Sequence, residues 1–141
     1  MKGVCCWMED IGLSREKMTK EMKFSFEELD VWNIALDFTE KVYIATKNFP
    51  KDEIYGITSQ LRRASLSISL NIAEGKGRYS NKEFKQFLFI ARGSLYETIT
   101  IMKLCLKLNY ITNNQYQDLI DDCQKIQSKI SGLLNYLKSK A

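Results

Sequence analysis

The spacing of the apolar residues is the feature that most constrains this chain. From Phe24 to the C-terminus, apolar residues recur every three or four positions with few interruptions. That spacing gathers them on one face of an α-helix, which has 3.6 residues per turn. Proline occurs once and glycine seven times in 141 residues, so few positions interrupt a helix. The sequence therefore predicts a small number of long helices.

Three breaks divide the helical pattern into four segments. Pro50 ends the first, because proline disfavours the helical conformation of the residue before it. Gly75 is well placed to end the second as a left-handed C-terminal cap. Asn109 and Tyr110 mark the turn after the third. The predicted helices cover residues 29–48, 51 or 52 to 74, 81–108 and 112–137.

Two of the predicted helix starts carry a capping signature. Ser80 is followed three residues later by Glu83, and Thr112 by Gln115, which is the spacing of a capping box. Four helices joined by short loops pack with alternating direction. We therefore predict an all-α fold, an antiparallel up-down-up-down four-helix bundle over residues 23–141.

The absence of histidine limits the chemistry of this chain, because histidine is the usual general base near neutral pH and the commonest metal ligand. A Ser-His-Asp triad, a Cys-His nucleophile and a histidine-containing zinc site are excluded. The four cysteines form no Cys-x-x-Cys pair. Gly75 and Gly77 lack the preceding strand that a phosphate-binding loop needs. We expect a non-catalytic protein that uses no metal and no cofactor.

Residues 1–22 show no sustained period and no charge bias, and we interpret them as a flexible extension outside the bundle. No stretch approaches the roughly 18 consecutive apolar residues of a membrane-spanning helix, and Met1–Leu13 holds no apolar run of signal-peptide length. Cys105 and Cys123 fall at apolar positions of predicted helices, as free thiols do in a reducing compartment. We expect a cytoplasmic protein that does not enter the membrane.

The predicted helix over residues 81–108 has two apolar stripes on a helical wheel. The first faces the bundle core and contains Phe84, Phe87, Leu88, Ala91, Leu95, Ile99 and Met102. The second contains Ile90, Ile101, Leu104 and Leu108. A bundle has one interior, so the second stripe has two explanations. It either widens the core face within the monomer or forms an interface between subunits, because a long apolar stripe left in water is an association site.

The third face of the same helix is basic. The chain carries a net charge of +4, and residues 81–108 hold five basic and two acidic side chains. The basic face contains Lys82, Lys85, Arg92, Lys103 and Lys107, with Phe89 and Tyr96 between them. Basic side chains interleaved with aromatic rings suit phosphate neutralisation and base stacking. The alternative is the ordinary solvated face of a soluble helix.

A polar stripe on the helix before it has a structural interpretation. Gln60, Ser67 and Asn71 share one face, and buried polar groups are paired in folded proteins. We expect a hydrogen-bond network there. Arg63 and Glu74 lie on a nearby face, as partners for each other or for a neighbouring subunit.

Several segments together resemble a known bacterial family. They are Phe49–Glu53, Tyr55–Gly56, Gln60–Gly75, Gly77–Arg78 and Ala91–Glu97. Their combination is similar to the "four helix bundle protein" family, whose founding members are encoded in intervening sequences of large-subunit ribosomal RNA genes. The resemblance extends from about Phe24 to Lys140. More distantly, the chain is similar to the accessory variability determinant proteins of diversity-generating retroelements.

The resemblance implies a four-helix bundle that assembles as a ring-like pentamer with a basic, nucleic-acid-binding surface. The retroelement relatives bind nucleic acid and a reverse transcriptase. The matched motifs place Arg62, Arg63 and Arg78 on this surface, and the helical wheel adds Lys82, Lys85 and Arg92. The leading hypothesis is a non-catalytic oligomeric scaffold that binds structured or ribosomal RNA. The alternative is an adaptor that docks an acidic or nucleic-acid-bound protein partner, such as a reverse transcriptase.

Overall fold

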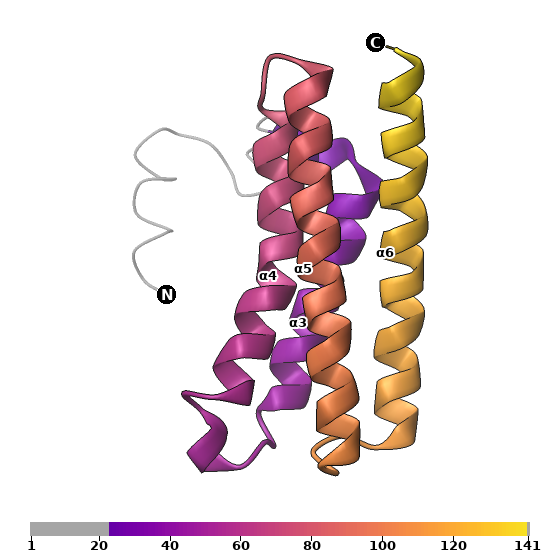
Figure 1. Cartoon of the computed structure of the whole chain (residues 1–141). Helices are drawn as coiled ribbons and strands as arrows, with labels where there is room; N and C mark the ends of the chain where they lie inside the picture. The colour runs from indigo at the N-terminus through magenta and orange to yellow at the C-terminus, as the bar shows by residue number, and fades with distance from the viewer. Residues whose placement is uncertain (1–22, 141) are drawn as a thin grey trace, which may run out of the picture.

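In the computed structural model, which describes residues 23–140, the helical periods of the sequence form four α-helices (Figure 1). These are α3 (Asp30–Thr46), α4 (Ile57–Lys76), α5 (Asn81–Lys107) and α6 (Asn113–Ser139). Two short 3₁₀ turns, η1 (Ser25–Glu28) and η2 (Lys51–Glu53), precede α3 and α4. Residues 23–140 contain no strand. The extension predicted over residues 1–22 lies outside the described residues.

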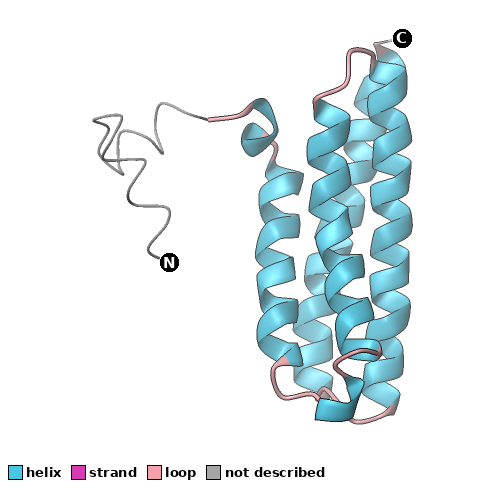
Figure 2. Ribbon diagram, turned by 90° about the vertical axis from the view of Figure 1, so that its left-hand side faces the viewer, coloured by secondary structure: helices cyan, strands magenta, loops and turns pink. Residues whose placement is uncertain are grey.

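The helices pack side by side in chain order, and α6 closes the bundle against α3. The α4–α5 connection and the C-terminus lie at one end of the bundle, and the α3–α4 and α5–α6 connections lie at the other (Figures 1 and 2). Neighbouring helices therefore run in opposite directions. The predicted all-α, up-down-up-down four-helix bundle is confirmed. Among the described helices, none combines the length and apolar character that crossing a bilayer requires.

The core is built by the apolar face that each helix presents to the bundle axis. Its largest fully buried side chains include Phe38, Ile68, Ile72, Leu88, Leu95, Met102, Ile126 and Ile130. Full burial of one such side chain stabilises the fold by about 1.5–3 kcal/mol relative to its exposure to water. All four helices contribute to this core, so the bundle folds around one shared apolar interior.

Both predicted N-caps are present at the helix starts. Thr112 Oγ1 accepts a hydrogen bond from Gln115 N, and Gln115 Oε1 accepts one from Thr112 N, which completes the capping box of α6. Ser80 Oγ accepts from Glu83 N at 3.1 Å. The Glu83 carboxylate accepts from the Ser80 hydroxyl rather than from its backbone N–H. The box of α5 is therefore half formed.

The second predicted helix begins later than expected. Residues 51–53 form η2, and α4 starts at Ile57. The Glu53 carboxylate accepts a hydrogen bond from Ile57 N at 3.1 Å and so satisfies a backbone donor at the new helix start. The spacing of the apolar residues alone predicts one continuous helix from residue 51 or 52. The Glu53 carboxylate cap instead separates η2 from α4.

The prediction that Gly75 is a left-handed C-terminal cap is wrong. Gly75 is buried inside α4, which continues to Lys76 and ends at Gly77 with a φ of −79°. A Cβ atom at position 75 would lie 2.6 Å from Phe87 Cβ and 3.0 Å from Phe84 Cδ1. Position 75 therefore requires glycine because α4 and α5 approach each other closely there. A left-handed residue occurs after the next helix, α5, at Asn109, which has a φ of 60°.

We predict that Gly75→Ala destabilises the bundle, because Phe87 and the α5 backbone must move to admit the methyl group. Overpacking of this kind costs about 1–3 kcal/mol. The matched control is Gly132→Ala in α6, where a Cβ atom meets nothing within 4 Å. That change is expected to raise the free energy of unfolding by about 0.5–1 kcal/mol through helix propensity. Urea titrations monitored by circular dichroism measure both. Equal stabilities for the two variants would contradict the close α4–α5 contact.

Two of the four cysteines lie in the described bundle, where Cys105 and Cys123 are buried free thiols, as predicted. Burial raises the pKa of Cys105 to about 11, with a smaller contribution from the Glu53 carboxylate. Burial raises the pKa of Cys123 to about 12, and Asp122 adds to the effect. Both thiols are therefore neutral in the folded protein near pH 7.

The raised thiol pKa values predict a loss of stability at alkaline pH. The unfolded chain releases these protons from the unperturbed value of 9.0, whereas the folded chain retains them to about 11 and 12. The stability is therefore intact below pH 9 and falls as the pH rises through 11. A Cys5→Ser, Cys6→Ser background isolates the two thiols. Its urea midpoint should fall more between about pH 8 and pH 10 than that of the same background with Cys105→Ala and Cys123→Ala. If the urea midpoints of the two proteins fell equally over this pH range, the buried thiols would not be the cause of the loss of stability.

Candidate nucleic-acid interface

The structure separates the six cations that the sequence places on a nucleic-acid surface. Arg62 is half-buried between α3 and α4, where its Nε donates to Thr46 Oγ1 at 2.8 Å. Its guanidinium carbon also lies 4.8 Å from the centroid of the Tyr43 ring. Since these contacts hold α3 against α4, Arg62 serves the bundle itself.

Arg63 lies on the other side of α4, in an open polar groove of about 520 Å³ between α4 and α5. Gln60 Nε2 donates to Glu97 Oε1 at 3.0 Å across this groove. Deeper in, the hydroxyls of Ser67 and Ser94 are hydrogen-bonded at 2.9 Å. The network expected for the polar stripe is therefore present. The Glu97 carboxylate makes this groove unfavourable for phosphate.

Arg78 lies just beyond the end of α4 and turns back onto the bundle. Its Nη2 forms an ion pair with Glu74 Oε1 at 3.1 Å, and its guanidinium carbon lies 4.7 Å from the Phe87 ring centroid. Glu74 therefore pairs with Arg78 and not with Arg63, one of the two partners considered from the sequence. The ion pair neutralises part of the Arg78 charge.

The structure brings Lys85 and Arg92 together in one groove between α5 and α6, which we call the α5–α6 groove. It has a volume of about 400 Å³ and is lined by Lys85, Phe89 and Arg92 of α5 and by Ser131, Leu134, Asn135 and Lys138 of α6. Three cations and no carboxylate line it. Lys82 is exposed one helical turn before Lys85. Lys103 and Lys107, on the same predicted face, lie at the far end of α5 and outside the groove.

An aromatic ring forms part of the α5–α6 groove. The Phe89 side chain remains 49% exposed, and the guanidinium carbon of Arg92 lies 5.0 Å from its ring centroid. One turn further along α5, Tyr96 Oη accepts a hydrogen bond from Gln127 Nε2 at 3.2 Å, which joins α5 to α6 directly. The groove therefore combines cations with a π-face, and the hydrogen bond between Tyr96 and Gln127 lies next to it.

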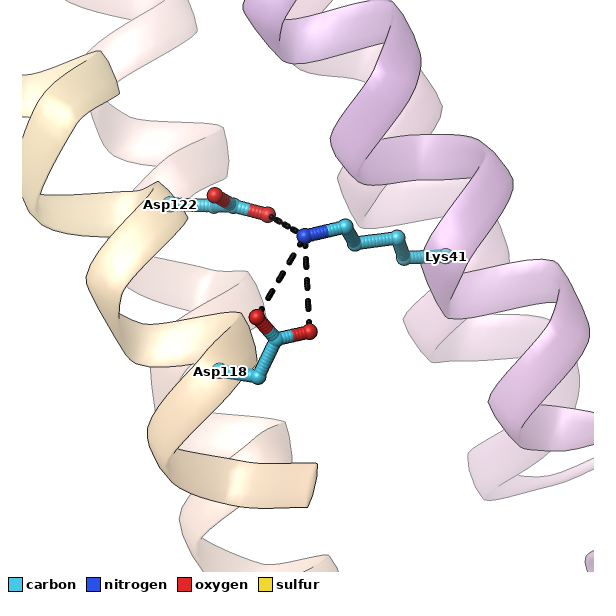
Figure 3. A network of polar contacts seen from close by, with 3 residues as sticks. All are labelled: Lys41, Asp118 and Asp122. Atoms are coloured by element: carbon cyan, nitrogen blue, oxygen red, sulfur yellow. Dashed lines mark hydrogen bonds and ion pairs between the residues drawn. The ribbon is translucent and has the colours of Figure 1, made fainter. Parts of the chain in front are cut away.

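The carboxylates of α6 lie away from this groove. Figure 3 shows Lys41 of α3 reaching between Asp118 and Asp122, with its Nζ 2.8 Å from Asp122 Oδ2 and 3.3 Å from Asp118 Oδ2. The hydrogen bond to Asp122 is the main reason that the pKa of Lys41 is raised. Asp122 and Asn135 are separated by about 20 Å along the helix axis. Two of the three aspartates of α6 are thus paired with α3, and none of the three lines the groove.

The second apolar stripe of α5 divides in the structure. Ile101 is half-buried and packs against the core. Ile90, Leu104 and Leu108 are 52%, 44% and 44% exposed. Leu70 of α4, which packs beside α5, is 57% exposed. The monomer therefore leaves most of the stripe in water on the face of α5 that turns toward α4.

Sequence reasoning missed the contribution of α6, namely Lys138, Ser131 and Asn135. A signal was present, because residues 123–141 carry four lysines and no carboxylate side chain. A charge count over residues 109–141 hides it, since that window includes the three aspartates at positions 118, 121 and 122. Within residues 23–140, no cluster of cysteine and acidic side chains could hold a metal ion.

Comparisons with known proteins agree with this architecture. No curated protein matches the chain. A crystal structure of a protein of unknown function from the S23 ribosomal protein family of Bacteroides thetaiotaomicron is similar, with a TM-score of 0.67 and 25% sequence identity. The match covers 74% of this chain and 97% of that one. The model of the 23S rRNA-intervening sequence protein family matches residues 27–132, which include most of the bundle. This chain therefore belongs to the 23S rRNA-intervening sequence protein family.

Proposed function

We propose that this protein is a non-catalytic, oligomeric scaffold that binds structured RNA, ribosomal RNA in the first place, through phosphate contacts of the α5–α6 surface. The observation that carries the proposal is the α5–α6 groove, where three cations from two helices converge without a carboxylate. The name of the family, which refers to intervening sequences of 23S rRNA, supports RNA as the ligand.

The cations of this surface differ in whether they line the groove. Lys85, Arg92 and Lys138 line the groove, and Lys82 extends the surface by one turn toward the start of α5. Each phosphate that such a side chain neutralises releases counterions from the RNA, which makes binding favourable and dependent on salt. Arg62 is occupied by Thr46 and Tyr43. We therefore assign RNA binding to the α5–α6 surface and a structural role to Arg62.

The oligomer is proposed to form through the exposed stripe of Ile90, Leu104 and Leu108, with Leu70 beside it. These side chains are between 44% and 57% exposed, and a long apolar stripe left in water is an association site. A pentamer, which the family resemblance implies, would repeat the α5–α6 groove in every copy and so add their electric fields.

We predict salt-dependent RNA binding that depends on the groove lysines. The unmodified protein should bind a labelled structured RNA at micromolar concentration in about 50 mM salt and much more weakly in about 200 mM salt. The Lys85→Glu, Lys138→Glu double variant should bind at least tenfold more weakly and with a shallower salt dependence. Fluorescence anisotropy measures both affinities, and circular dichroism checks that helicity is unchanged.

The matched control for this prediction is Lys103→Glu, Lys107→Glu, which makes the same charge change on α5 outside the groove. It should lose no more than about threefold in affinity, as expected of long-range screening. An equal loss in the two double variants would show that net charge, not the groove, drives binding. Absence of RNA binding by the unmodified protein at both salt concentrations would overturn the proposed function and favour the adaptor hypothesis.

We also predict that Ile90→Glu combined with Leu104→Glu dissociates the oligomer into folded monomers of 16.4 kDa. Both side chains are about half exposed, so the change leaves the core intact and places charge in an apolar contact. Ile44→Glu combined with Ile54→Glu is the control, because these side chains are equally exposed on other parts of the bundle. Analytical ultracentrifugation gives the masses. A monomeric unmodified protein, or an unchanged assembly mass in the test variant, would contradict this interface.

A further inference from the structure

We propose that the α5–α6 groove is a subsite for one unpaired nucleotide of the RNA, whose base stacks at Phe89 and Arg92 and whose phosphate contacts Lys85 and Lys138. The inference rests on the proposed function, and it specifies which element of an RNA the protein selects. The chain would then favour RNA with a bulged or single-stranded nucleotide over a continuous duplex.

The size of the groove favours a single nucleotide. Its volume of about 400 Å³ lies at the lower end of the roughly 300–1,000 Å³ range of small-ligand pockets. Leu134, which is 9% exposed, forms an apolar floor between the two helices. A duplex presents a continuous outer surface of phosphates and cannot enter such a groove, whereas an unstacked base can.

The walls of the groove match the parts of a nucleotide. Aromatic rings and guanidinium planes are the surfaces on which unpaired RNA bases stack, and Phe89 and Arg92 supply one of each. The cations Lys85 and Lys138 come from opposite sides of the groove, from α5 and α6. They are therefore able to contact a phosphate whose base lies between the helices.

Two polar side chains of α6 are able to form hydrogen bonds with the bound nucleobase. Ser131 and Asn135 line the groove, and neither makes a side-chain hydrogen bond to another residue of the described range 23–140. A hydroxyl and an amide offer both donors and acceptors to the edge of a base. In the α4–α5 groove, by contrast, Gln60 is already bonded to Glu97 and Ser67 to Ser94. The α5–α6 groove therefore combines unoccupied polar groups, cations and an aromatic face, and no carboxylate lines it, whereas Glu97 lines the α4–α5 groove.

The proposed oligomer leaves this subsite open. The exposed apolar stripe lies on the side of α5 that turns toward α4, and the groove lies on the side that turns toward α6. The hydrogen bond between Tyr96 and Gln127 holds α5 and α6 together next to the groove. The groove is thus formed within each copy by residues of α5 and α6 alone.

The test compares two RNA hairpins with the same stem, one fully paired and one with a single bulged 2-aminopurine. The unmodified protein should bind the bulged hairpin roughly tenfold or more tightly than the paired one, and the 2-aminopurine fluorescence should be quenched on binding. Phe89→Leu keeps an apolar side chain but removes the π-face, so the preference and the quenching should both disappear. Phe89→Tyr should retain them. Because Phe89 is half exposed, both variants are expected to fold.

The outcomes separate the inference from the proposed function. Equal affinity for the two hairpins, unaffected by Phe89→Leu, would overturn the subsite and leave RNA binding in place. Absence of binding to either hairpin would overturn the proposed function. Adenosine monophosphate serves as the probe for a free nucleotide and should compete only at millimolar concentration. Tighter binding of this mononucleotide than of the bulged hairpin would overturn the assignment to an RNA strand.

Discussion

The close contact between α4 and α5 is the constraint on which the rest of the structure depends. Gly75 leaves room for Phe84 and Phe87 at one end of this pair, and the Ser67–Ser94 hydrogen bond lies nearer the middle. With α5 fixed against α4 on one side, its long outer surface has a defined orientation. The faces that remain are the groove shared with α6 and the exposed stripe of Ile90, Leu104 and Leu108. The two surfaces proposed to bind RNA and a second copy are thus oriented by a contact that contains none of their side chains.

Acidic and basic side chains are separated along α6, which affects both the stability of the helix and the surface potential. The three aspartates of α6 precede its lysines along the helix, and Lys138 lies in the last turn, where the helix dipole favours a cation. Lys41 pairs with Asp118 and Asp122 near the start of the helix (Figure 3). The pair with Asp118, whose side chain is 65% exposed, adds little to stability and acts mainly on the surface potential. Lys138 lies at the other end of α6, where no acidic side chain lines the groove.

The sequence predicts the bundle, its core and two of its N-caps because these depend on local spacing. The period of the apolar residues and the Ser80 and Thr112 signatures are readable without knowledge of a neighbouring helix. The true role of Gly75 is not readable in this way, because the same residue suits a helix end and a close helix contact. The α5–α6 groove is likewise hidden, since it depends on the register that brings Lys138 level with Lys85. Arg62 shows the reverse case, where a matched motif residue turns inward to Thr46.

Helix α5 therefore has three faces with different physical requirements, and this division explains its composition. The core face must be apolar, and it buries Leu88, Leu95 and Met102 completely. The face toward α6 must stay cationic and half exposed if it is to neutralise phosphate, which excludes nearby carboxylates. The face toward α4 leaves Ile90, Leu104 and Leu108 between 44% and 52% exposed. An apolar stripe left in water is an association site, which is the basis of the oligomer proposed above. The proposed assembly and the proposed RNA binding therefore use different faces of one helix.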